Sequence, residues 1–238
     1  MRKLFTSAAA MLLLVPALAF AQAGDEHAGH EGHDHGAMAQ PAQPATPAAP
    51  VAPARDPNLP AGEAGAKAVL ESSPRHGEFV DVAVPGRATP LRAWVVYPER
   101  RDKAPVVIVI HEIFGLTDWI RGVTDQLAKE GFLAVAPDLL SGLGPNGGGT
   151  ESLANRDEAV KLVRTLKADS VQAALAATRA WATAQPSASG RSAAVGFCWG
   201  GSTSFAFAIA QPSLDGAIVY YGSSPDSASL LQLTPPVL

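Results

Sequence analysis

The chain has 238 residues, of which 47% are hydrophobic and 17% are charged, so it can bury one sizeable core. Its formal net charge is −4, and Lys and Arg form no cluster along it. Because nucleic-acid binding needs clustered positive charge, we expect no nucleic-acid partner.

Residues 1–23 have the pattern of a secretory signal peptide. Arg2 and Lys3 give a positive start, residues 8–20 are apolar, and small residues at 19–23 offer cleavage sites. The apolar run is shorter than the roughly 20 residues that span a bilayer as a helix, so we expect no stable membrane insertion after cleavage. The pattern predicts export, with a mature protein that is periplasmic or secreted.

Residues 24–71 are interpreted as a disordered linker. Its first part, GDEHAGHEGHDHG at 24–36, is rich in histidine and acidic residues, and residues 37–66 are rich in Ala, Pro and Gly. Two interpretations of the first part stay open: a solvated spacer, or a ligand set for zinc, copper or nickel, although the spacing matches no closed structural zinc site. The candidate ligands are His27, His30, His33 and His35.

Globular patterning is expected over residues 72–238 and begins with two β-prone runs. Glu78 to Val84 and Leu91 to Tyr97 are predicted strands, and PGRATP at 85–90 is typical of a hairpin connection. We therefore expect a hairpin at the start of the domain.

Strands and helices alternate after the hairpin. Pro105 to Ile110 is a continuous β-branched run, which suits a strand buried on both faces of a parallel sheet. The alternation predicts an α/β fold in which helices cover the sheet. Further strands are predicted over 132–136, 191–197 and 214–221, helices over 119–130, 151–167, 170–185 and 200–210, a helix C-cap at Gly131 and a glycine-rich loop over 142–150.

The only cysteine, Cys198, lies between a predicted strand and a predicted helix. Gly196-x-Cys198-x-Gly200 is the nucleophile-elbow pattern G-x-S-x-G with cysteine in place of serine, and in so tight a turn larger side chains at the glycine positions would clash. The helix N-terminus favours a thiolate there, and the N–H of Trp199 points toward an oxyanion. The alternatives are a buried structural cysteine and a thiol reductase or peroxidase, which would lack a resolving cysteine.

A second motif, HEIFG at 111–115, directly follows the strand that is predicted to end at Ile110. In folds with a nucleophile elbow, the loop after the third strand supplies the other oxyanion N–H, and Ile113 is the candidate donor. We expect Glu112 to point into the same cleft, the alternative being a surface carboxylate, and His111 to be structural. Because no second histidine follows at the required spacing, this is not a zinc motif, and no metal is expected in the domain.

Four stretches together resemble the dienelactone hydrolase family: VIVIHEIFGLTDWI at 107–120, APDLL at 136–140, GFCWGG at 196–201 and VYYGS at 219–223. The resemblance implies an α/β-hydrolase fold with a mostly parallel sheet and helices on both faces. It also implies a Cys-His-Asp triad without a cofactor, which opens lactones and related esters through an acyl-enzyme. It places a glutamate beside the thiol, at Glu112, and oxyanion donors at Ile113 and Trp199.

The acid and the histidine of that triad have no counterpart at the expected place. In this fold they follow the nucleophile, yet no histidine comes after His111, and Asp226 follows the last predicted strand too closely. Thr234 to Leu238 has the pattern of the start of a further strand. We therefore expect a C-terminally incomplete member that lacks its last strands and the triad Asp and His, and whose activity is lost or impaired as it stands.

Two functions from different classes remain. The first is a cysteine-dependent hydrolase of lactones or small esters, which forms a thioacyl intermediate on Cys198. The alternative is a non-catalytic exported protein that binds zinc, copper or nickel through the histidine-rich tract at 24–36. Thiol labelling of Cys198 and metal titration of the tract would separate them.

Overall fold

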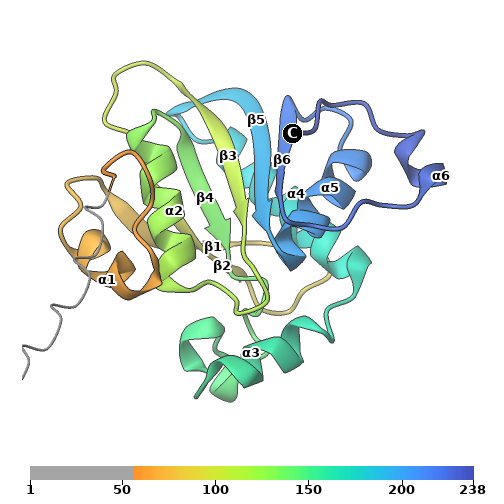
Figure 1. Cartoon of the computed structure of the whole chain (residues 1–238), viewed down its shortest axis with the longest axis horizontal. Helices are drawn as coiled ribbons and strands as arrows, with labels where there is room; N and C mark the ends of the chain where they lie inside the picture. Colours follow the sequence, from red (N-terminus) through yellow and green to blue (C-terminus); the bar gives the residue numbers. More distant parts are fainter. Residues whose placement is uncertain (1–55) are drawn as a thin grey trace, which may run out of the picture. The chain divides into compact units, whose positions relative to one another are not determined.

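The computed structural model describes residues 56–238 of the chain. At its centre lies a six-stranded sheet with the order β1-β2-β4-β3-β5-β6 (Figure 1). This order places β3 and β5 side by side although they are far apart in the sequence. The strands are β1 (Gly77–Val82), β2 (Leu91–Val96), β3 (Ala104–Ile110), β4 (Leu133–Pro137), β5 (Ala188–Phe197) and β6 (Gly216–Tyr220).

The sheet is mostly parallel, as the sequence predicts. β1 and β2 form the expected hairpin, in which Val82 pairs with Leu91, and β2 is also antiparallel to β4. The β3–β4, β3–β5 and β5–β6 pairs are parallel. The carboxyl ends of β3 to β6 therefore meet at one edge of the sheet, where Glu112 follows β3 and Cys198 follows β5.

Helices cover both faces of the sheet (Figure 1). Alternating side chains of β3 show this: Val107 and Val109 pack with α2, whereas Ile108 and Ile110 pack with α4. α5 lies on the same side as α4, because Phe207 belongs to the α4 cluster. The helices are α1 (Glu63–Glu71), α2 (Asp118–Lys129), α3 (Arg156–Val163), α4 (Ala168–Thr183), α5 (Trp199–Ala210) and α6 (Ser227–Leu230). Between residues 56 and 238, no helix is long and apolar enough to cross a membrane.

The two central strands are almost completely buried. All five residues of β4 are buried, and only Pro105 of β3 is not. Val, Ile, Leu and Ala fill both faces of these strands, which is why their sequences read as continuous apolar runs rather than as alternating ones. The loops that follow β3 and β4 thus begin at the buried centre of the sheet.

Regular structure begins earlier than the sequence patterning indicates. α1 lies inside the segment that was interpreted as a linker up to residue 71, and it packs against α2. A helix of nine residues is marginal by itself, so tertiary packing rather than a strong local pattern stabilises α1. This explains why the composition of the segment did not predict the helix α1.

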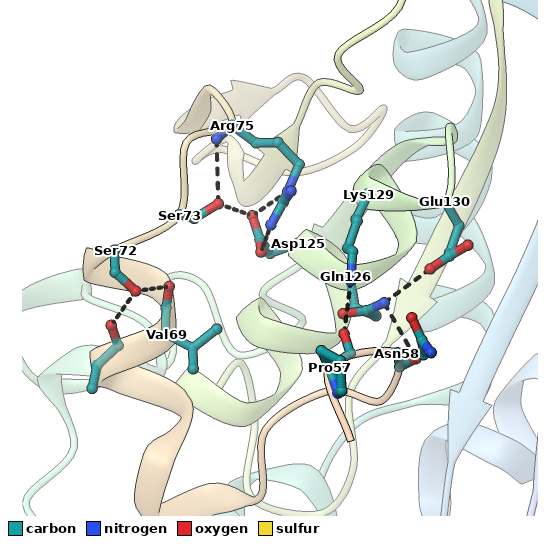
Figure 2. A network of polar contacts seen from close by, with 11 residues as sticks. Pro57, Asn58, Val69, Ser72, Ser73, Arg75, Asp125, Gln126, Lys129 and Glu130 are labelled. Atoms are coloured by element: carbon teal, nitrogen blue, oxygen red, sulfur yellow. Dashed lines mark hydrogen bonds and ion pairs between the residues drawn. The ribbon is translucent and has the colours of Figure 1, made fainter. Parts of the chain in front are cut away.

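Polar contacts also attach the residues on both sides of α1 to α2 (Figure 2). Arg75 binds Asp125 of α2 with two hydrogen bonds, Nε to Oδ1 at 3.0 Å and Nη2 to Oδ2 at 2.6 Å. Ser73 Oγ donates to the same carboxylate at 2.6 Å, and Lys129 Nζ donates to the Pro57 carbonyl at 2.7 Å. The Asp125 side chain is only 5% exposed, so this ion pair is largely shielded from water.

The predicted helix over 151–167 is wrong at both ends. Thr150–Ser152 forms a short 3-10 turn, and α3 begins only at Arg156 and ends at Val163. Asn155 caps α3, because its side chain accepts a hydrogen bond from the Glu158 N–H at 3.1 Å. An asparagine side chain competes with backbone acceptors in this way, so it starts a helix rather than continuing one.

A short segment pairs with β6 on the side opposite β5. The Ala217 N–H donates to the Pro236 carbonyl at 2.9 Å, and the Val219 N–H donates to the Leu238 carbonyl at 2.8 Å. Val237 forms a parallel bridge with Ala217. The predicted start of a further strand over 234–238 is thus confirmed.

Candidate active site

Cys198 stands at the junction of β5 and α5. Its backbone has a φ of 55° and a ψ of −119°, and it is the N-cap residue of α5. A positive φ is rare for a residue with a side chain and marks local strain. The Cys198 N–H donates to the Tyr220 carbonyl at 3.0 Å, so the neighbouring strand β6 holds the turn in place.

Glycines make this turn possible. A Cβ atom on Gly196 would overlap the carbonyl group of Gly200, and one on Gly200 would overlap the carbonyl oxygens of Ile110 and His111. A Cβ atom on Gly201 would lie 2.6 Å from the Tyr220 carbonyl oxygen. The first turn of α5 therefore packs directly against the backbone at the ends of β3 and β6, and larger residues would push Cys198 out of position.

His111, at the start of the loop after β3, is fully buried and holds this loop through two hydrogen bonds. Its Nε2 accepts the Leu139 N–H at 3.2 Å, so Nδ1 carries the hydrogen and donates to the Glu112 carbonyl at 2.7 Å. Burial lowers the pKa of the ring, which keeps it neutral. Its ring also stacks on Trp199, with ring centroids 5.6 Å apart. Both ring nitrogens are thus used, and His111 has the structural role that the sequence indicates.

A second anchor for this loop comes from the segment after β4. Thr150 Oγ1 donates to Asp138 Oδ1 at 2.8 Å and accepts the Leu116 N–H at 2.9 Å. Asp138 also accepts the Thr150 N–H at 2.7 Å and is fully buried. Sequence reasoning missed both residues. Asp138 has a local signal, because it directly follows a buried strand in the stretch APDLL, whereas nothing in the sequence singles out Thr150.

Glu112 occupies a half-buried position in the loop between His111 and Ile113. Burial raises the pKa of its carboxyl group above the ordinary value. No hydrogen bond or ion pair engages this side chain among residues 56–238. Glu112 also lies close enough to Tyr221 to raise the pKa of that phenol, as does Cys198. All three residues come just after the carboxyl end of a strand: Glu112 after β3, Cys198 after β5 and Tyr221 after β6.

Two backbone N–H groups close to this edge make no hydrogen bond among residues 56–238. Trp199 is the first residue of α5, where an N–H has no acceptor within the helix. Ile113 is the second residue of a turn closed by the Gly115 N–H and the Glu112 carbonyl at 3.3 Å, so its own N–H is not used by the turn. Neither N–H donates a hydrogen bond within the described part of the chain. These are the two groups that the sequence suggests as oxyanion donors.

Tyr221 also lies at this edge, and sequence reasoning did not select it, although it belongs to the stretch VYYGS at 219–223. It follows β6 directly, has a φ of 42° and is 69% exposed. Its partial burial is the largest cause of the raised pKa of its phenol, followed by the negative charges of Glu112 and Cys198. Its position depends on backbone packing between segments that are distant in sequence, which residue patterns do not reveal.

Metal ligands do not gather in the described part of the chain: no group of three or more His, Cys, Asp or Glu residues could hold an ion there. His76 is exposed and lies 3.5 Å from Glu78 on β1, away from the carboxyl edge. The predicted signal peptide and the four candidate ligands His27, His30, His33 and His35 lie outside the described residues, and metal binding by this tract stays a prediction.

Together, the sheet and the elbow define a class of protein. A strained residue with a nucleophilic side chain, between a parallel strand and a helix at the carboxyl edge of the sheet, is the hallmark of the α/β-hydrolase fold. The solved structure of a candidate dienelactone hydrolase from Klebsiella pneumoniae has this fold and superposes with a TM-score of 0.55 at 28% sequence identity. The match covers 68% of this chain and 71% of that one.

The sequence is more specific still. The model of the dienelactone hydrolase family matches residues 91–237, and the chain belongs to this family. Carboxymethylenebutenolidase 1 of Cupriavidus pinatubonensis is 39% identical over 126 residues, which are 51% of this chain and 52% of that protein. A candidate carboxymethylenebutenolidase of Yersinia pestis is 33% identical over 156 residues, 64% of this chain and 57% of that protein. The chain thus spans little more than half of the length of these relatives.

Proposed function

We propose that this protein is a cysteine-dependent hydrolase of lactones or small esters, which works through a thioacyl intermediate on Cys198. The observation that carries the proposal is the strained elbow at Cys198, at the carboxyl edge where the loop with Glu112 also begins. The name carboxymethylenebutenolidase denotes a butenolide, which is a lactone, as the substrate of the relatives. A lactone is a cyclic ester, so one mechanism serves both substrate types.

Acylation can be written with the residues at this edge. The Glu112 carboxylate takes the thiol proton as the Cys198 sulfur forms a bond to the carbonyl carbon. The carbonyl oxygen becomes an oxyanion that accepts hydrogen bonds from the N–H groups of Ile113 and Trp199. The C–O bond then breaks, and the leaving oxygen takes the proton back from Glu112. The products are an alcohol, or the opened lactone chain, and a thioester on Cys198.

Release of the acyl group needs a base that activates water. Of the two histidines between residues 56 and 238, His111 is buried with both nitrogens engaged, and His76 precedes β1, at the edge of the sheet opposite the elbow. Glu112 is the only ionisable group that we assign to this step. Since losing a triad histidine slows such enzymes by orders of magnitude, we expect the 238-residue chain to be acylated much faster than it is deacylated.

Rapid kinetics with p-nitrophenyl acetate test this proposal. We expect a burst of about one equivalent of p-nitrophenolate per chain, followed by a slow steady rate, as an accumulating acyl-enzyme requires. Cys198→Ala, which removes the sulfur and keeps a small side chain, should abolish the burst. A burst of the same size in Cys198→Ala would overturn the proposal, as would the absence of any burst from the folded wild-type chain.

A further inference from the structure

The backbone at Tyr221 is strained. Its φ of 42° lies in the left-handed region, which bulky residues rarely adopt. On one side, the carbonyl group of the preceding Tyr220 is fixed because it accepts the Cys198 N–H. The chain bends at Tyr221, immediately after this bond, so the conformation of Tyr221 is tied directly to the elbow.

The residues after Tyr221 are fixed as well. A Cβ atom on Gly222 would overlap the backbone of Gly201 and Ser202, so these segments are in close contact. The Ser223 N–H donates to Ser202 Oγ at 2.8 Å. Tyr221 therefore lies between Tyr220, which is bonded to Cys198, and Gly222, which packs on the first turn of α5. Its positive φ follows from both contacts.

The phenol ring is poorly packed, so packing does not offset this strain. It is 69% exposed, and its contact with the Phe197 ring is a tilted one with centroids 6.4 Å apart. Asparagine or glycine would adopt the same backbone conformation more easily. Strain that packing does not offset is typical of functional sites, where a conformation serves to place a side chain.

The position of the ring gives it a chemical role. Tyr221 follows β6 at the edge of the sheet where Cys198 follows β5, and a tyrosine hydroxyl is protonated at neutral pH. The raised pKa of this phenol agrees with that state. A protonated phenol is a hydrogen-bond donor. The Glu112 carboxylate offers only acceptors, so Tyr221 adds a side-chain donor to this part of the site.

We infer that Tyr221 is an ester-binding residue of the site proposed above: its ring bounds the space beside the Cys198 sulfur, and its hydroxyl donates a hydrogen bond to the bound ester. The inference rests on the proposed function. It assigns Tyr221 to substrate binding and leaves activation of the thiol to Glu112.

Two reactions of the same thiol test this division of roles. Acylation by p-nitrophenyl acetate needs a bound ester, whereas alkylation by iodoacetamide reports the reactivity of the thiol alone. In Tyr221→Phe we expect the second-order acylation rate to fall about tenfold, the effect of one lost hydrogen bond, and alkylation to stay within about twofold of wild type. Tyr97→Phe, which removes a phenol hydroxyl remote from the site, should change neither rate.

Tyr221→Gly tests the strain separately. Glycine adopts the positive φ freely, so we expect a thermal midpoint no lower than that of wild type, together with slower acylation. Three results would overturn the inference: equal acylation rates in wild type and Tyr221→Phe, a parallel loss of acylation and alkylation, or a lower midpoint in Tyr221→Gly. If wild type shows no acylation at Cys198 at all, the proposed function fails first and the inference falls with it.

Discussion

The backbone N–H of Cys198 and the carbonyl oxygen of Tyr220 are 3.0 Å apart, and this single bond ties the elbow to the neighbouring strand. Because of it, the thiol and the residue after Tyr220 share one rigid frame. The glycines on both sides of Cys198 allow the close approach. The position of the nucleophile is therefore a property of backbone packing across β3, β5 and β6.

Replacing Gly196 by alanine tests this packing. The new Cβ atom would overlap the Gly200 carbonyl group, which cannot move without displacing α5. We expect Gly196→Ala to lower the free energy of unfolding by about 3 kcal/mol, as overpacking against backbone does, and to slow the alkylation of Cys198. Urea unfolding measures the first effect. Gly62→Ala is the matched control, since its Cβ would meet nothing within 4 Å, and a loss as large there would contradict the explanation.

Glu112 should make stability depend on pH. Its pKa is raised by burial, so the folded protein holds the proton more tightly than the unfolded chain does. The contribution of Glu112 to the free energy of unfolding is therefore fully present below the pKa of the unfolded chain, about 4.5, and is lost as the pH rises through the higher pKa of the folded protein. In thermal melts from about pH 4 to pH 8, Glu112→Gln should gain stability relative to wild type as the pH rises.

An exposed glutamate provides the control for this series. Glu71 lies at the end of α1 and is exposed, so Glu71→Gln should follow the wild-type curve. A constant difference between Glu112→Gln and wild type at every pH would show that the carboxyl group of Glu112 is not buried as described.

His111 should have the opposite pH dependence. Burial lowers its pKa, so below about pH 6.5 His111 binds a proton in the unfolded chain but stays neutral in the folded protein. The contribution of His111 to the free energy of unfolding is thus present above that pH and is lost as the pH falls. His111→Gln should remove this slope and, by disturbing the bonds to Leu139 and Glu112, lower the free energy of unfolding by about 2 kcal/mol.

The same variant separates structure from chemistry. If His111 were the base that activates the thiol, His111→Gln would lose the acylation burst while still folded. We expect the folded variant to keep the burst, and its loss at a temperature where the variant is fully folded would contradict the structural role.

The ion pair between Arg75 and Asp125 is shielded from water, so its contribution to the free energy of unfolding should be large enough to measure. Asp125→Ala leaves the largely buried guanidinium of Arg75 without its partner, so we expect a loss of about 3 kcal/mol in the free energy of unfolding. Arg191→Ala breaks an exposed pair with Asp215 and should cost less than about 1 kcal/mol. Equal losses in the two variants would mean that burial does not matter here.

Local features of this site were predictable from the sequence, whereas long-range ones were not. The elbow at Cys198 could be found because its glycines lie within two residues of it, and the buried strand before His111 is visible as an apolar run. The link from Asp138 through Thr150 to Leu116, in contrast, joins three separate segments. Patterns of neighbouring residues carry no information about such contacts, and the conformation of Tyr221 has the same origin.

The fold follows the same division. Strands β3 and β4 were predictable because burial on both faces demands continuous apolar sequence. The helix α1 was not, because packing on α2 stabilises a short segment that is rich in Ala and Gly. The start of α3 was misjudged because the capping bond of Asn155 depends on backbone geometry.

The position of the acyl group decides whether Cys198 is the nucleophile. The 238-residue chain is treated with p-nitrophenyl acetate, quenched in acid and digested, and the peptides are mapped by mass spectrometry. We expect one acetyl group, on the peptide that contains Cys198, which neutral hydroxylamine removes as it does from other thioesters. An unmodified Cys198 alongside released p-nitrophenolate, or an acetyl group on a lysine or serine instead, would contradict this expectation.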